Sequence, residues 1–303
     1  MPAISVVIPA YNAEGTILET IASVQQQTFS DFELIVINDG STDGTLELLQ
    51  GIKDKRLRIF SYENGGLPVA RNRGITHATG EFIAFLDADD LWTLDKLELQ
   101  LAALQQHPEA GVAYSWTSDF VDEQKETLYS YEPIFFEGNV LPHLLVKNFL
   151  ASGSNPLIRK EAIESVGEFD PTLKSCEDWD FYLRLAAKWQ FVVVPKWQIL
   201  YRRSSTSMSS KVEIMETAAL TVLERAFQAI SMEYQYLKPQ SFAWAFHYCA
   251  QQYLRYATNL SEVNQAGKRI WKAIRLYPKI LFRRGAQALI LWFIKRWIMV
   301  QIT

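Results

Sequence analysis

The sequence contains little cysteine and no long apolar run. Cys176 and Cys249 are the only cysteines among 303 residues, which excludes a disulfide framework and a cysteine-rich metal site and fits a reducing cytosol. The longest nearly apolar stretch, Ala286–Ile294, has about half of the roughly 20 residues that a membrane-spanning helix needs. Residues Met1–Thr16 lack a basic segment before their apolar run, so we expect neither a signal peptide nor a segment that crosses a bilayer unaided.

Two phosphate-binding signatures are also missing. The chain contains no G-x-x-x-x-G-K-[ST] and no G-x-G-x-x-G, which excludes a P-loop and a dinucleotide fingerprint. The length allows one large domain or two smaller ones, and 49% apolar and 21% charged residues are ordinary for a globular protein. The net charge of −4 gives no general affinity for nucleic acid, so we expect no nucleic-acid partner.

The charges are unevenly distributed along the chain. Residues Lys268–Thr303 carry nine Lys or Arg and no Asp or Glu, whereas the rest of the chain carries 21 basic and 34 acidic residues. Five of the basic residues recur every three or four positions and predict one basic stripe on a helix that Pro278 kinks: Lys268, Lys272, Arg275, Lys279 and Arg283. With nearby aromatic residues, this pattern is typical of a helix on an anionic membrane surface. The solvated basic face of an ordinary helical bundle is the alternative.

Apolar segments recur in the first part of the chain. Phe82–Leu86 predicts a strand buried on both faces of a mainly parallel sheet, and Ala3–Pro9 predicts a buried first strand. We expect a second strand at Glu33–Asn38 and a short third strand at Leu57–Ser61. The intervening segments predict helices, one with Ile17, Ile21 and Val24 on a single face and another at Thr45–Gln50. Strands that alternate with helices predict an α/β fold with a doubly wound, mainly parallel sheet whose loops gather on one edge.

The rest of the chain predicts a second half of this domain and a helical region. After Trp92 we expect an amphipathic helix with Leu94, Leu97, Leu101 and Leu104 on one face. Two further strands are expected at Gly111–Trp116 and Phe191–Leu200, and Pro195 should break the second one. The pattern is helical from Lys211 onward. We therefore expect one domain over residues 1–210, with a nucleotide-binding half (1–92) and an acceptor half (93–210), followed by a helical region over residues 211–303.

Three carboxylates follow the buried segment Phe82–Leu86: Asp87, Asp89 and Asp90. In an extended chain, Asp87 and Asp89 point the same way, and like charges at that distance repel unless a cation lies between them. Hard oxygen ligands at the carboxyl edge of an α/β sheet suit Mg²⁺ or Mn²⁺ that carries a diphosphate. A solvated acidic turn is the alternative for an isolated D-x-D, but the buried strand and the neighbouring loops favour a metal site at Asp89.

Four loops, in order, resemble the motif series of the family-2 glycosyltransferases. They are Pro9-Ala10-Tyr11-Asn12, Asn38-Asp39-Gly40-Ser41-Thr42-Asp43, Ala70-Arg71-Asn72-x-Gly74 and Asp87-Ala88-Asp89-Asp90. Their order and spacing match over Ile4–Trp92, and residues 139–169 resemble the acceptor side of the family. Members of this family are inverting enzymes with a GT-A fold. The resemblance therefore implies a GT-A fold, a nucleotide-sugar donor and a glycan or lipid-linked acceptor, as in cell-surface polysaccharide assembly.

The resemblance also assigns donor-side roles to single residues. The base and ribose would be surrounded by Pro9, Ala10, Tyr11 and Asn12, with Glu14 beside them, and Asp39 would accept a hydrogen bond from the base imide. Arg71 would lie near the base and phosphate, and Asp87 and its neighbour Ala88 would lie at the ribose. Asp89 would hold the metal on the diphosphate. An imide donor favours uracil or thymine. Taken singly, Tyr11 also fits a core residue, Asn12 a helix N-cap, Asp43 a turn former and Arg71 a surface cation.

A second acidic motif, Ser175–Asp180, opens another predicted helix. By resemblance, Asp178 is the general base that deprotonates the acceptor hydroxyl, with Glu177 and Trp179 on the acceptor side. An acid close to a helix N-terminus has a lowered pKa, so it is ionised and able to accept a proton. The alternative is structural, because Ser175 and Asp178 have the spacing of a capping box.

The segment Tyr201–Ser210 resembles the closing segment of the family but lacks the histidine that many members carry. Arg202 or Arg203 is a candidate to meet the diphosphate in its place. A plain linker between the two predicted regions is the alternative.

These expectations combine into an inverting, metal-assisted glycosyltransferase that is peripheral on the cytoplasmic face of a membrane. A sugar-phosphate nucleotidyltransferase would need a glycine-rich, basic loop after the first strand, which Pro9-Ala10-Tyr11-Asn12 is not. A non-catalytic nucleotide-sugar-binding protein of the same fold would be expected to lose its acids, yet Asp39, Asp87, Asp89 and Asp178 are all present.

Overall fold

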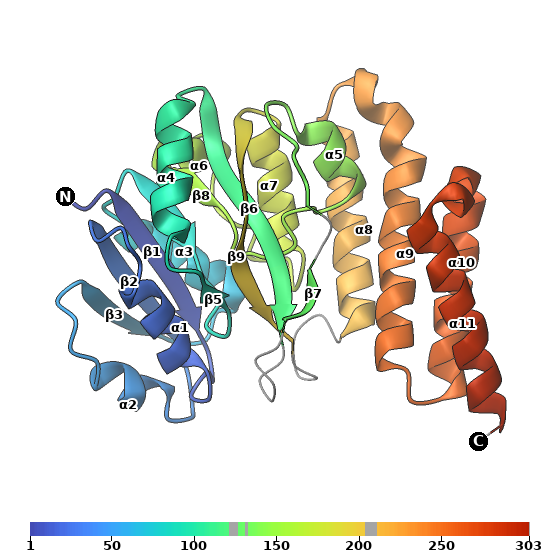
Figure 1. Cartoon of the computed structure of the whole chain (residues 1–303), viewed down its shortest axis with the longest axis horizontal. Helices are drawn as coiled ribbons and strands as arrows, with labels where there is room; N and C mark the ends of the chain where they lie inside the picture. Colours follow the sequence, from blue (N-terminus) through green and yellow to red (C-terminus); the bar gives the residue numbers. More distant parts are fainter. Residues whose placement is uncertain (121–126, 131–132, 204–210, 303) are drawn as a thin grey trace. The chain divides into compact units, whose positions relative to one another are not determined.

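A computed structural model describes residues 1–120, 127–130, 133–203 and 211–302 of the chain (Figure 1). Contacts between Cα atoms divide the chain into two compact units. Unit 1 consists of Met1–Leu141, Phe149–Leu173 and Asp180–Ser204, and unit 2 consists of Pro142–Asn148, Lys174–Trp179 and Ser205–Thr303. The β-sheet belongs to unit 1, and the C-terminal helices belong to unit 2.

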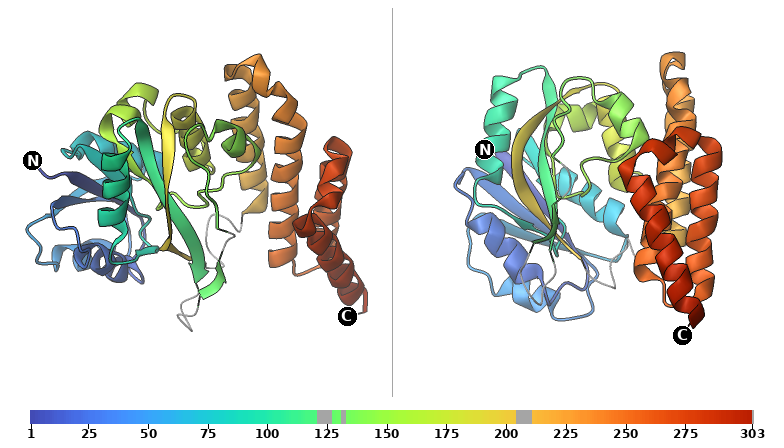
Figure 2. Two further views of the ribbon diagram at one scale, coloured as in Figure 1. Left: turned by 45° about the horizontal axis from the view of Figure 1, so that its top comes forward. Right: turned by 45° about the vertical axis from the view of Figure 1, so that its right-hand side comes forward.

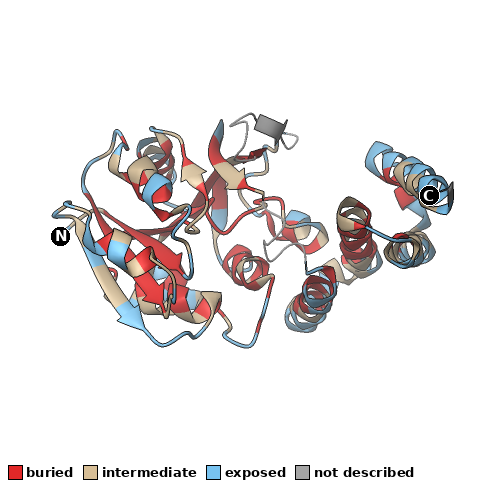
Figure 3. Cartoon of the chain, turned by 90° about the horizontal axis from the view of Figure 1, so that it is seen from below, coloured by how far each residue is buried: buried red, intermediate tan, exposed pale blue. Residues whose placement is uncertain are grey.

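Four parallel strands form one half of the sheet. In spatial order they are β3 (Leu57–Tyr62), β2 (Phe32–Asp39), β1 (Ile4–Ala10) and β4 (Phe82–Phe85). Every residue of β1, β2 and β4 is buried, as the red strands of Figure 3 show, because helices cover both faces. Helices α1 (Ile17–Gln25) and α4 (Lys96–Gln106) pack on one face, α3 (Leu67–His77) packs on the other, and α2 (Thr45–Gln50) links β2 to β3. The predicted doubly wound, mainly parallel sheet is confirmed.

The other half of the sheet contains antiparallel pairs. Strand β8 (Leu157–Arg159) lies between β4 and β6 (Ala110–Phe120) and is antiparallel to both. Strand β9 (Gln190–Arg202) runs parallel to β6, and β5 (Leu91–Trp92) is antiparallel to β9. Strand β7 (Thr127–Ser130) pairs with β6 in the antiparallel sense. Strands β5, β7 and β8 contain two to four residues each. Such short segments carry too few positions for a periodic signal, so the sequence did not predict them.

The break predicted at Pro195 is wrong. Strand β9 continues through Pro195 to Arg202, and its register with β6 shifts there: Tyr114 pairs with Val193 and Trp116 with Trp197. The extra residues on β9 form an irregularity in the ladder, where a residue without an amide hydrogen is tolerated. The proline therefore bends the pairing without ending the strand.

The remaining helices that contribute residues to unit 1 are α6 (Lys160–Val166) and most of α7 (Glu177–Ala186), whereas most of α5 (Leu141–Val146) belongs to unit 2. In α4, the predicted apolar face is confirmed for Leu97, Leu101 and Leu104, which are buried in the core beneath β1. Leu94 is a correction, because it precedes the helix and is 54% exposed.

Gly74 fixes how closely α3 approaches β1. A Cβ atom on Gly74 would lie 2.1 Å from Cγ1 of Val7 in the fully buried strand β1. Gly74→Ala is therefore expected to force α3 away from the sheet and to lower the free energy of unfolding by about 1–3 kcal/mol. Chemical denaturation of the variant and the wild type measures this difference.

Gly15→Ala is the matched control for Gly74→Ala. Gly15 is exposed, and apart from Gly15 and its two chain neighbours no atom of the described residues lies within 4 Å of the position of an added Cβ. Its effect should stay within about 0.5 kcal/mol. Equal unfolding midpoints for Gly74→Ala and Gly15→Ala would contradict the close packing of α3 on β1.

The C-terminal region of unit 2 is helical, as predicted from Lys211 onward (Figure 2). It contains α8 (Val212–Ala229), η2 (Met232–Leu237), α9 (Lys238–Tyr256), α10 (Leu260–Leu276), η3 (Pro278–Phe282) and α11 (Arg284–Ile302). Leu254 of α9, Val263 of α10 and Leu289 of α11 share one buried core. In the part of the chain that the structure describes, no helix has the length and apolar character of a membrane span.

The single basic stripe predicted on one kinked helix is wrong. Helix α10 ends at Leu276, Tyr277 leaves the helical region with φ −141° and ψ 81°, and Pro278 begins η3. Proline removes a backbone donor and disfavours the helical conformation of the residue before it, so the helix ends instead of bending. The five cations are exposed, but they are divided between α10 (Lys268, Lys272, Arg275), η3 (Lys279) and the residue before α11 (Arg283).

Candidate active site

The loops that follow β1 and β2 are hydrogen-bonded to each other at the carboxyl edge of the sheet. Asn12 adopts a positive φ of 48°, its backbone N–H donates to Oγ of Ser41 (3.1 Å), and its Oδ1 accepts from the backbone N–H of Thr42 (2.8 Å). The N-cap residue of α1 is Thr16, so the alternative of Asn12 as a helix N-cap is wrong. Tyr11 is 53% exposed at the end of β1, so it is not a core residue. Its ring is therefore open to solvent at this edge.

Pro9 and Ala10, the last residues of β1, are buried beneath this loop. Ala88 is fixed from the other side, because its carbonyl oxygen accepts hydrogen bonds from Oγ1 of Thr16 (2.8 Å), the N-cap residue of α1, and from Oγ1 of Thr20 (3.0 Å) in α1. The turn that contains Ala88 is thus attached to α1.

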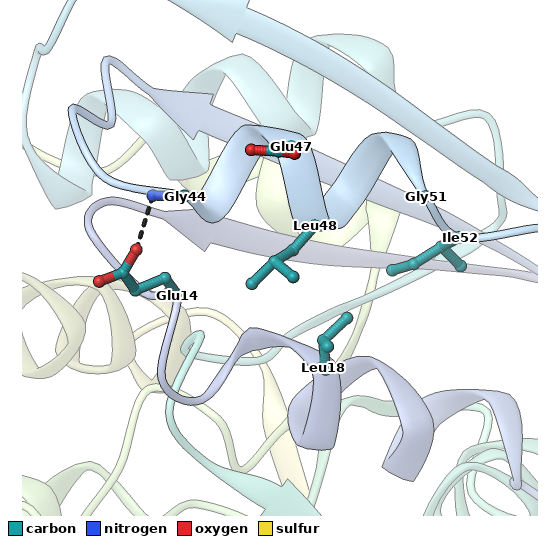
Figure 4. Close-up of a pocket in the computed structure, with 7 residues that line it drawn as sticks. All are labelled: Glu14, Leu18, Gly44, Glu47, Leu48, Gly51 and Ile52. Atoms are coloured by element: carbon teal, nitrogen blue, oxygen red, sulfur yellow. Dashed lines mark hydrogen bonds between the residues drawn. The ribbon is translucent and has the colours of Figure 1, made fainter.

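Glu14 is one of the residues that line a hollow between α1 and α2 (Figure 4). Its Oε2 accepts a hydrogen bond from the backbone N–H of Gly44 (2.7 Å), at the N-terminus of α2. Its own N–H donates to Oδ2 of Asp43 (3.1 Å), and Oδ1 of Asp43 accepts from the N–H of Thr45 (3.0 Å). Asp43 therefore stabilises this turn, as the alternative of Asp43 as a turn former predicts. The hollow is lined by Glu14, Leu18, Gly44, Glu47, Leu48, Gly51 and Ile52.

Asp39, the last residue of β2, is buried and anchors the turn that precedes α3. Its carboxylate accepts hydrogen bonds from the backbone N–H groups of Gly65 (3.0 Å) and Gly66 (2.8 Å) and from Nη1 of Arg73 (2.6 Å). Gly66 has a φ of 87°, which favours glycine at this position. A contact between Asp39 and a base imide remains a prediction.

Arg71 is fully buried, so the alternative of a surface cation is wrong. Its Nη2 forms a 2.7 Å ion pair with Oδ1 of Asp87, and its guanidinium lies 5.3 Å from the centre of the Phe169 ring. Gly153 makes room for it, because a Cβ atom there would lie 2.3 Å from Nη2. Sequence reasoning missed Gly153 and Phe169, since both are far from Arg71 in the chain.

Asp90 does not share the exposed edge with its neighbours and is fully buried. Its carboxylate accepts hydrogen bonds from Oγ of Ser154 (2.6 Å), Oγ of Ser152 (3.2 Å) and the backbone N–H of Arg202 (3.0 Å). Burial raises the pKa of Asp90 well above its ordinary value, and the charges of Asp89 and Asp87 add to the rise. Asp90 therefore fixes the turn to β9 and to the loop before β8.

Asp89 is the half-buried carboxylate of the turn. Burial, followed by the charge of Asp87, raises the pKa of Asp89 to about 6. A divalent cation would offset both effects, and carboxylate oxygens are the donors that Mg²⁺ and Mn²⁺ prefer. In the part of the chain that the structure describes, no group of three or more His, Cys, Asp or Glu is arranged to hold a metal ion. The site thus fits a cation that takes most of its remaining ligands from a bound diphosphate or water.

Arg202 supports this turn from β9. Its Nε donates to the carbonyl oxygen of Asp89 (2.6 Å), and its Nη2 forms a 2.9 Å ion pair with Glu19 of α1. Arg203 pairs with Asp119 (2.9 Å). Contact of either arginine with a diphosphate remains a prediction, and residues 204–210 of the expected closing segment lie outside the described residues.

Asp178 lies in the first turn of α7, in the part of that helix assigned to unit 2. Its Oδ1 accepts a 2.7 Å hydrogen bond from the backbone N–H of Trp179, and its Oδ2 accepts from Nδ2 of Asn148 (3.3 Å). Trp179 is buried and donates from Nε1 to the carbonyl oxygen of Leu144 (2.8 Å), and Glu177 is buried as well. These two donors hold the Asp178 carboxylate in one orientation. No spacing in the sequence singled out Asn148.

The residues expected on the donor side thus lie in unit 1, and Glu177, Asp178 and Trp179, which are expected on the acceptor side, lie in unit 2. Tyr11, Asn12 and Glu14 belong to one hydrogen-bonded set of loops, and Arg71, Asp87 and Asp89 belong to the neighbouring turn. Thr16 before α1 and Thr20 within it connect the two.

Known proteins with similar sequences are glycosyltransferases by name. An uncharacterized glycosyltransferase of Rickettsia felis is 37% identical over 191 residues, which are 61% of this chain and 30% of that protein. The Escherichia coli protein named UDP-Glc:alpha-D-GlcNAc-diphosphoundecaprenol beta-1,3-glucosyltransferase WfgD is 41% identical over 102 residues, 33% of this chain and 40% of WfgD. The chain therefore spans less than half the length of these relatives.

Solved structures share the fold over nearly the whole chain. The crystal structure of S. aureus TarS 1–349 in complex with UDP-GlcNAc matches 98% of this chain and 90% of that one, with a TM-score of 0.62 and 20% identity. The mannosyltransferase PcManGT from Pyrobaculum calidifontis, in complex with GDP-Man and Mn²⁺, matches 98% of this chain and 87% of its own, with a TM-score of 0.62 and 18% identity. The fold is GT-A, as predicted. The family described as "Glycosyltransferase like family 2" matches residues 5–253, and the chain belongs to that family.

Proposed function

We propose that the chain is an inverting glycosyltransferase that moves a sugar from a nucleoside-diphosphate donor to a hydroxyl of a glycan or lipid-linked acceptor. The observation that carries this proposal is the carboxyl edge of the parallel strands, where the half-buried Asp89 lies beside the Arg71–Asp87 pair. Ligands of open α/β sheets bind at this edge. The names of the similar proteins support sugar transfer. In this proposal, residues 1–92 bind the donor and residues 93–210 frame the acceptor.

We infer that Asp89 holds Mg²⁺ or Mn²⁺ in the donor complex. When bound, such an ion neutralises charge on the departing diphosphate. Arg202 keeps the Asp89 backbone in place, and Asp87 is already paired with Arg71, which leaves Asp89 as the carboxylate of this turn best suited to a cation. The structure of PcManGT with GDP-Man and Mn²⁺ supports a divalent cation in this fold.

The proposed reaction needs a proton acceptor and no covalent intermediate. Asp178 would take the proton from the acceptor hydroxyl as its oxygen bonds to the anomeric carbon. The bond from that carbon to the diphosphate oxygen breaks in the same displacement, and the nucleoside diphosphate leaves with the electron pair. Asn148 and the N–H of Trp179 would hold the carboxylate in one orientation. Catalysis would come from positioning, proton removal and stabilisation of the leaving group.

The nucleotide is proposed to carry uracil or thymine, because Asp39 would accept from the base imide. TarS was solved with UDP-GlcNAc and PcManGT with GDP-Man, so the shared fold does not decide the base. Competition binding with uridine, thymidine and guanosine diphosphates tests the donor class directly.

Asp39→Asn is expected to weaken binding of the preferred uridine or thymidine diphosphate by about 1–3 kcal/mol, because the base imide loses a charged acceptor. Asparagine is a better test than alanine, since an amide oxygen can still accept from Gly65 and Gly66. Isothermal titration of nucleotide into the variant and the wild type measures the loss.

Arg73→Gln is the control, because it removes the Asp39–Arg73 ion pair and leaves the carboxylate in place. We expect it to change nucleotide affinity far less than Asp39→Asn. Equal losses in the two variants, or a guanosine diphosphate sugar as the preferred donor, would make this interpretation of Asp39 wrong.

We also propose that the protein is peripheral on the cytoplasmic face of a membrane, with residues 268–303 toward anionic lipid. Their nine positive charges and no negative one favour such a surface. The name of WfgD specifies a diphosphoundecaprenol acceptor, which supports a lipid-linked acceptor here. Ala273, Ile280 and Leu289 of this segment are buried in the cores of unit 2. Tests of membrane binding therefore need point substitutions, since deletion of the segment would open these cores.

A further inference from the structure

Helix α11 has one face that packs inside unit 2. Ala286 and Leu289 are buried, and the ring of Phe293 lies so close to Gly267 of α10 that a Cβ atom there would approach it to 2.8 Å. Arg296 donates from Nη2 to the carbonyl oxygen of Ala257 (2.8 Å). These contacts fix the rotation of α11 about its axis, so the side chains that point away from unit 2 are defined.

The opposite face of α11 is apolar and exposed. Leu291 is 67% exposed, Ile294 46% and Ile298 47%, and the spacing of three and four residues places them on one stripe. Figure 3 shows exposed residues along this helix near the C-terminus. We define the outward face of α11 as Leu291, Ile294 and Ile298 with the exposed cations Arg284 and Lys295. An exposed apolar stripe of this kind is typical of an interaction surface.

The charges on and near this face indicate what covers it. Arg284 and Lys295 lie among the apolar side chains, and Lys279 and Arg283 flank Phe282, which is 85% exposed in η3. The sequence has no Asp or Glu between Lys268 and Thr303. A second copy of the chain would bring like charges together on this face, whereas anionic headgroups would pair with the cations and apolar chains would cover the leucine and isoleucines.

We propose that the outward face of α11 inserts into the headgroup region of an anionic lipid bilayer. This inference deepens the proposed membrane association and rests on it, but it does not depend on sugar transfer. It assigns the apolar contact to α11, whereas the exposed cations Lys268, Lys272 and Arg275 of α10 contribute attraction at longer range. An interfacial helix of this type lies in the plane of the membrane, with its apolar side about 5–10 Å deep.

Co-sedimentation of the full chain with vesicles of phosphatidylglycerol and phosphatidylcholine tests the proposal at low salt and at about 1 M salt, where the screening length is about 3 Å. The wild type should bind at low salt and keep part of its binding at high salt, because apolar burial is not screened. The double variant Leu291→Gln/Ile298→Gln should bind about 100-fold more weakly at both salt concentrations, about tenfold for each side chain. Arg284→Gln/Lys295→Gln should weaken binding chiefly at low salt, about fivefold for each charge.

Ile214→Gln on α8 is the matched control, since Ile214 belongs to the same unit and is 41% exposed. It should leave vesicle binding unchanged, and thermal melting checks that each variant is folded. The proposal is overturned if the Leu291/Ile298 variant sediments like the wild type, or if the wild type ignores anionic vesicles at low salt. Light scattering that shows a dimer dissociated by the double variant would instead assign the face to a second copy. Asp178→Asn should bind vesicles normally, so a failure of the proposed catalysis is distinguishable from a failure here.

Discussion

Asp178→Asn is expected to bind the donor with wild-type affinity and to transfer sugar roughly 10²–10⁴-fold more slowly. The substitution removes the proton acceptor and keeps the shape of the side chain. Its amide oxygen can still accept the hydrogen bond that the N–H of Trp179 now donates to Oδ1 of Asp178. The steady-state rate of transfer and the dissociation constant of the nucleotide, measured on the same preparation, give both quantities.

Asp180→Asn is the matched control on the same helix. Asp180 forms a 2.9 Å ion pair with Arg184 four residues later, and Arg184 is also held by the carbonyl oxygens of Val166 and Glu168. Loss of this ion pair should leave transfer close to the wild-type rate. If Asp178→Asn loses donor binding as severely as turnover, or keeps full activity, Asp178 is a structural residue at the start of α7.

Asp89→Ala is expected to reduce metal-dependent transfer by at least about 100-fold, because it removes the carboxylate that would hold the cation on the diphosphate. The turn should remain folded, since its attachments run through Asp87, Asp90 and the backbone. Asp89→Asn should also keep the fold and lose activity. Turnover with increasing Mn²⁺ or Mg²⁺, and the melting temperature of each variant, measure the two effects.

Asp95→Asn is the control for general loss of negative charge, because Asp95 forms an ion pair with Lys196 and has no place in the proposed site. It should respond to Mn²⁺ like the wild type. Full activity of Asp89→Ala in the presence of a chelator would make the metal assignment wrong.

Local pattern predicted the carboxyl edge of the parallel strands because every residue of β1, β2 and β4 is buried, and a strand buried on both faces shows as an unbroken apolar run. The positions of Asp39, Asp87 and Asp89 at the strand ends followed from this. The surface-cation alternative for Arg71 failed for a long-range reason. Arg71 is buried because Gly153 and Phe169, far away in the chain, surround it.

The difference in burial between Asp89 and Asp90 could not be predicted from the local sequence pattern. The two are adjacent and chemically alike, but Ser152, Ser154 and the backbone of Arg202 take Asp90 into the interior. Asn148, which donates to Asp178, comes from a segment with no distinguishing spacing. Residue type predicted that carboxylates gather here, and only the tertiary structure separates the buried one from the half-buried one.

The sequence contains the signal for the break after α10, Pro278, but this proline ends the helix where only a kink is predicted. Pro278 was expected to bend one long helix, yet Tyr277 leaves the helical region and a new helix starts at Arg284. A proline both removes a donor and restricts the residue before it. The break therefore assigns the exposed apolar face to α11 and the largest group of cations to α10, which is the arrangement that the proposed membrane contact uses.

The most direct test of sugar transfer is release of nucleoside diphosphate from a panel of nucleotide sugars, with Mn²⁺ or Mg²⁺ and with or without membrane lipid extract. We expect one uridine or thymidine diphosphate sugar to release its nucleotide, at a rate that the extract increases and that Asp178→Asn and Asp89→Ala each lower by at least about 100-fold. Release that is undiminished in both variants, or a folded wild type that binds none of the nucleoside diphosphates, would contradict the proposed function.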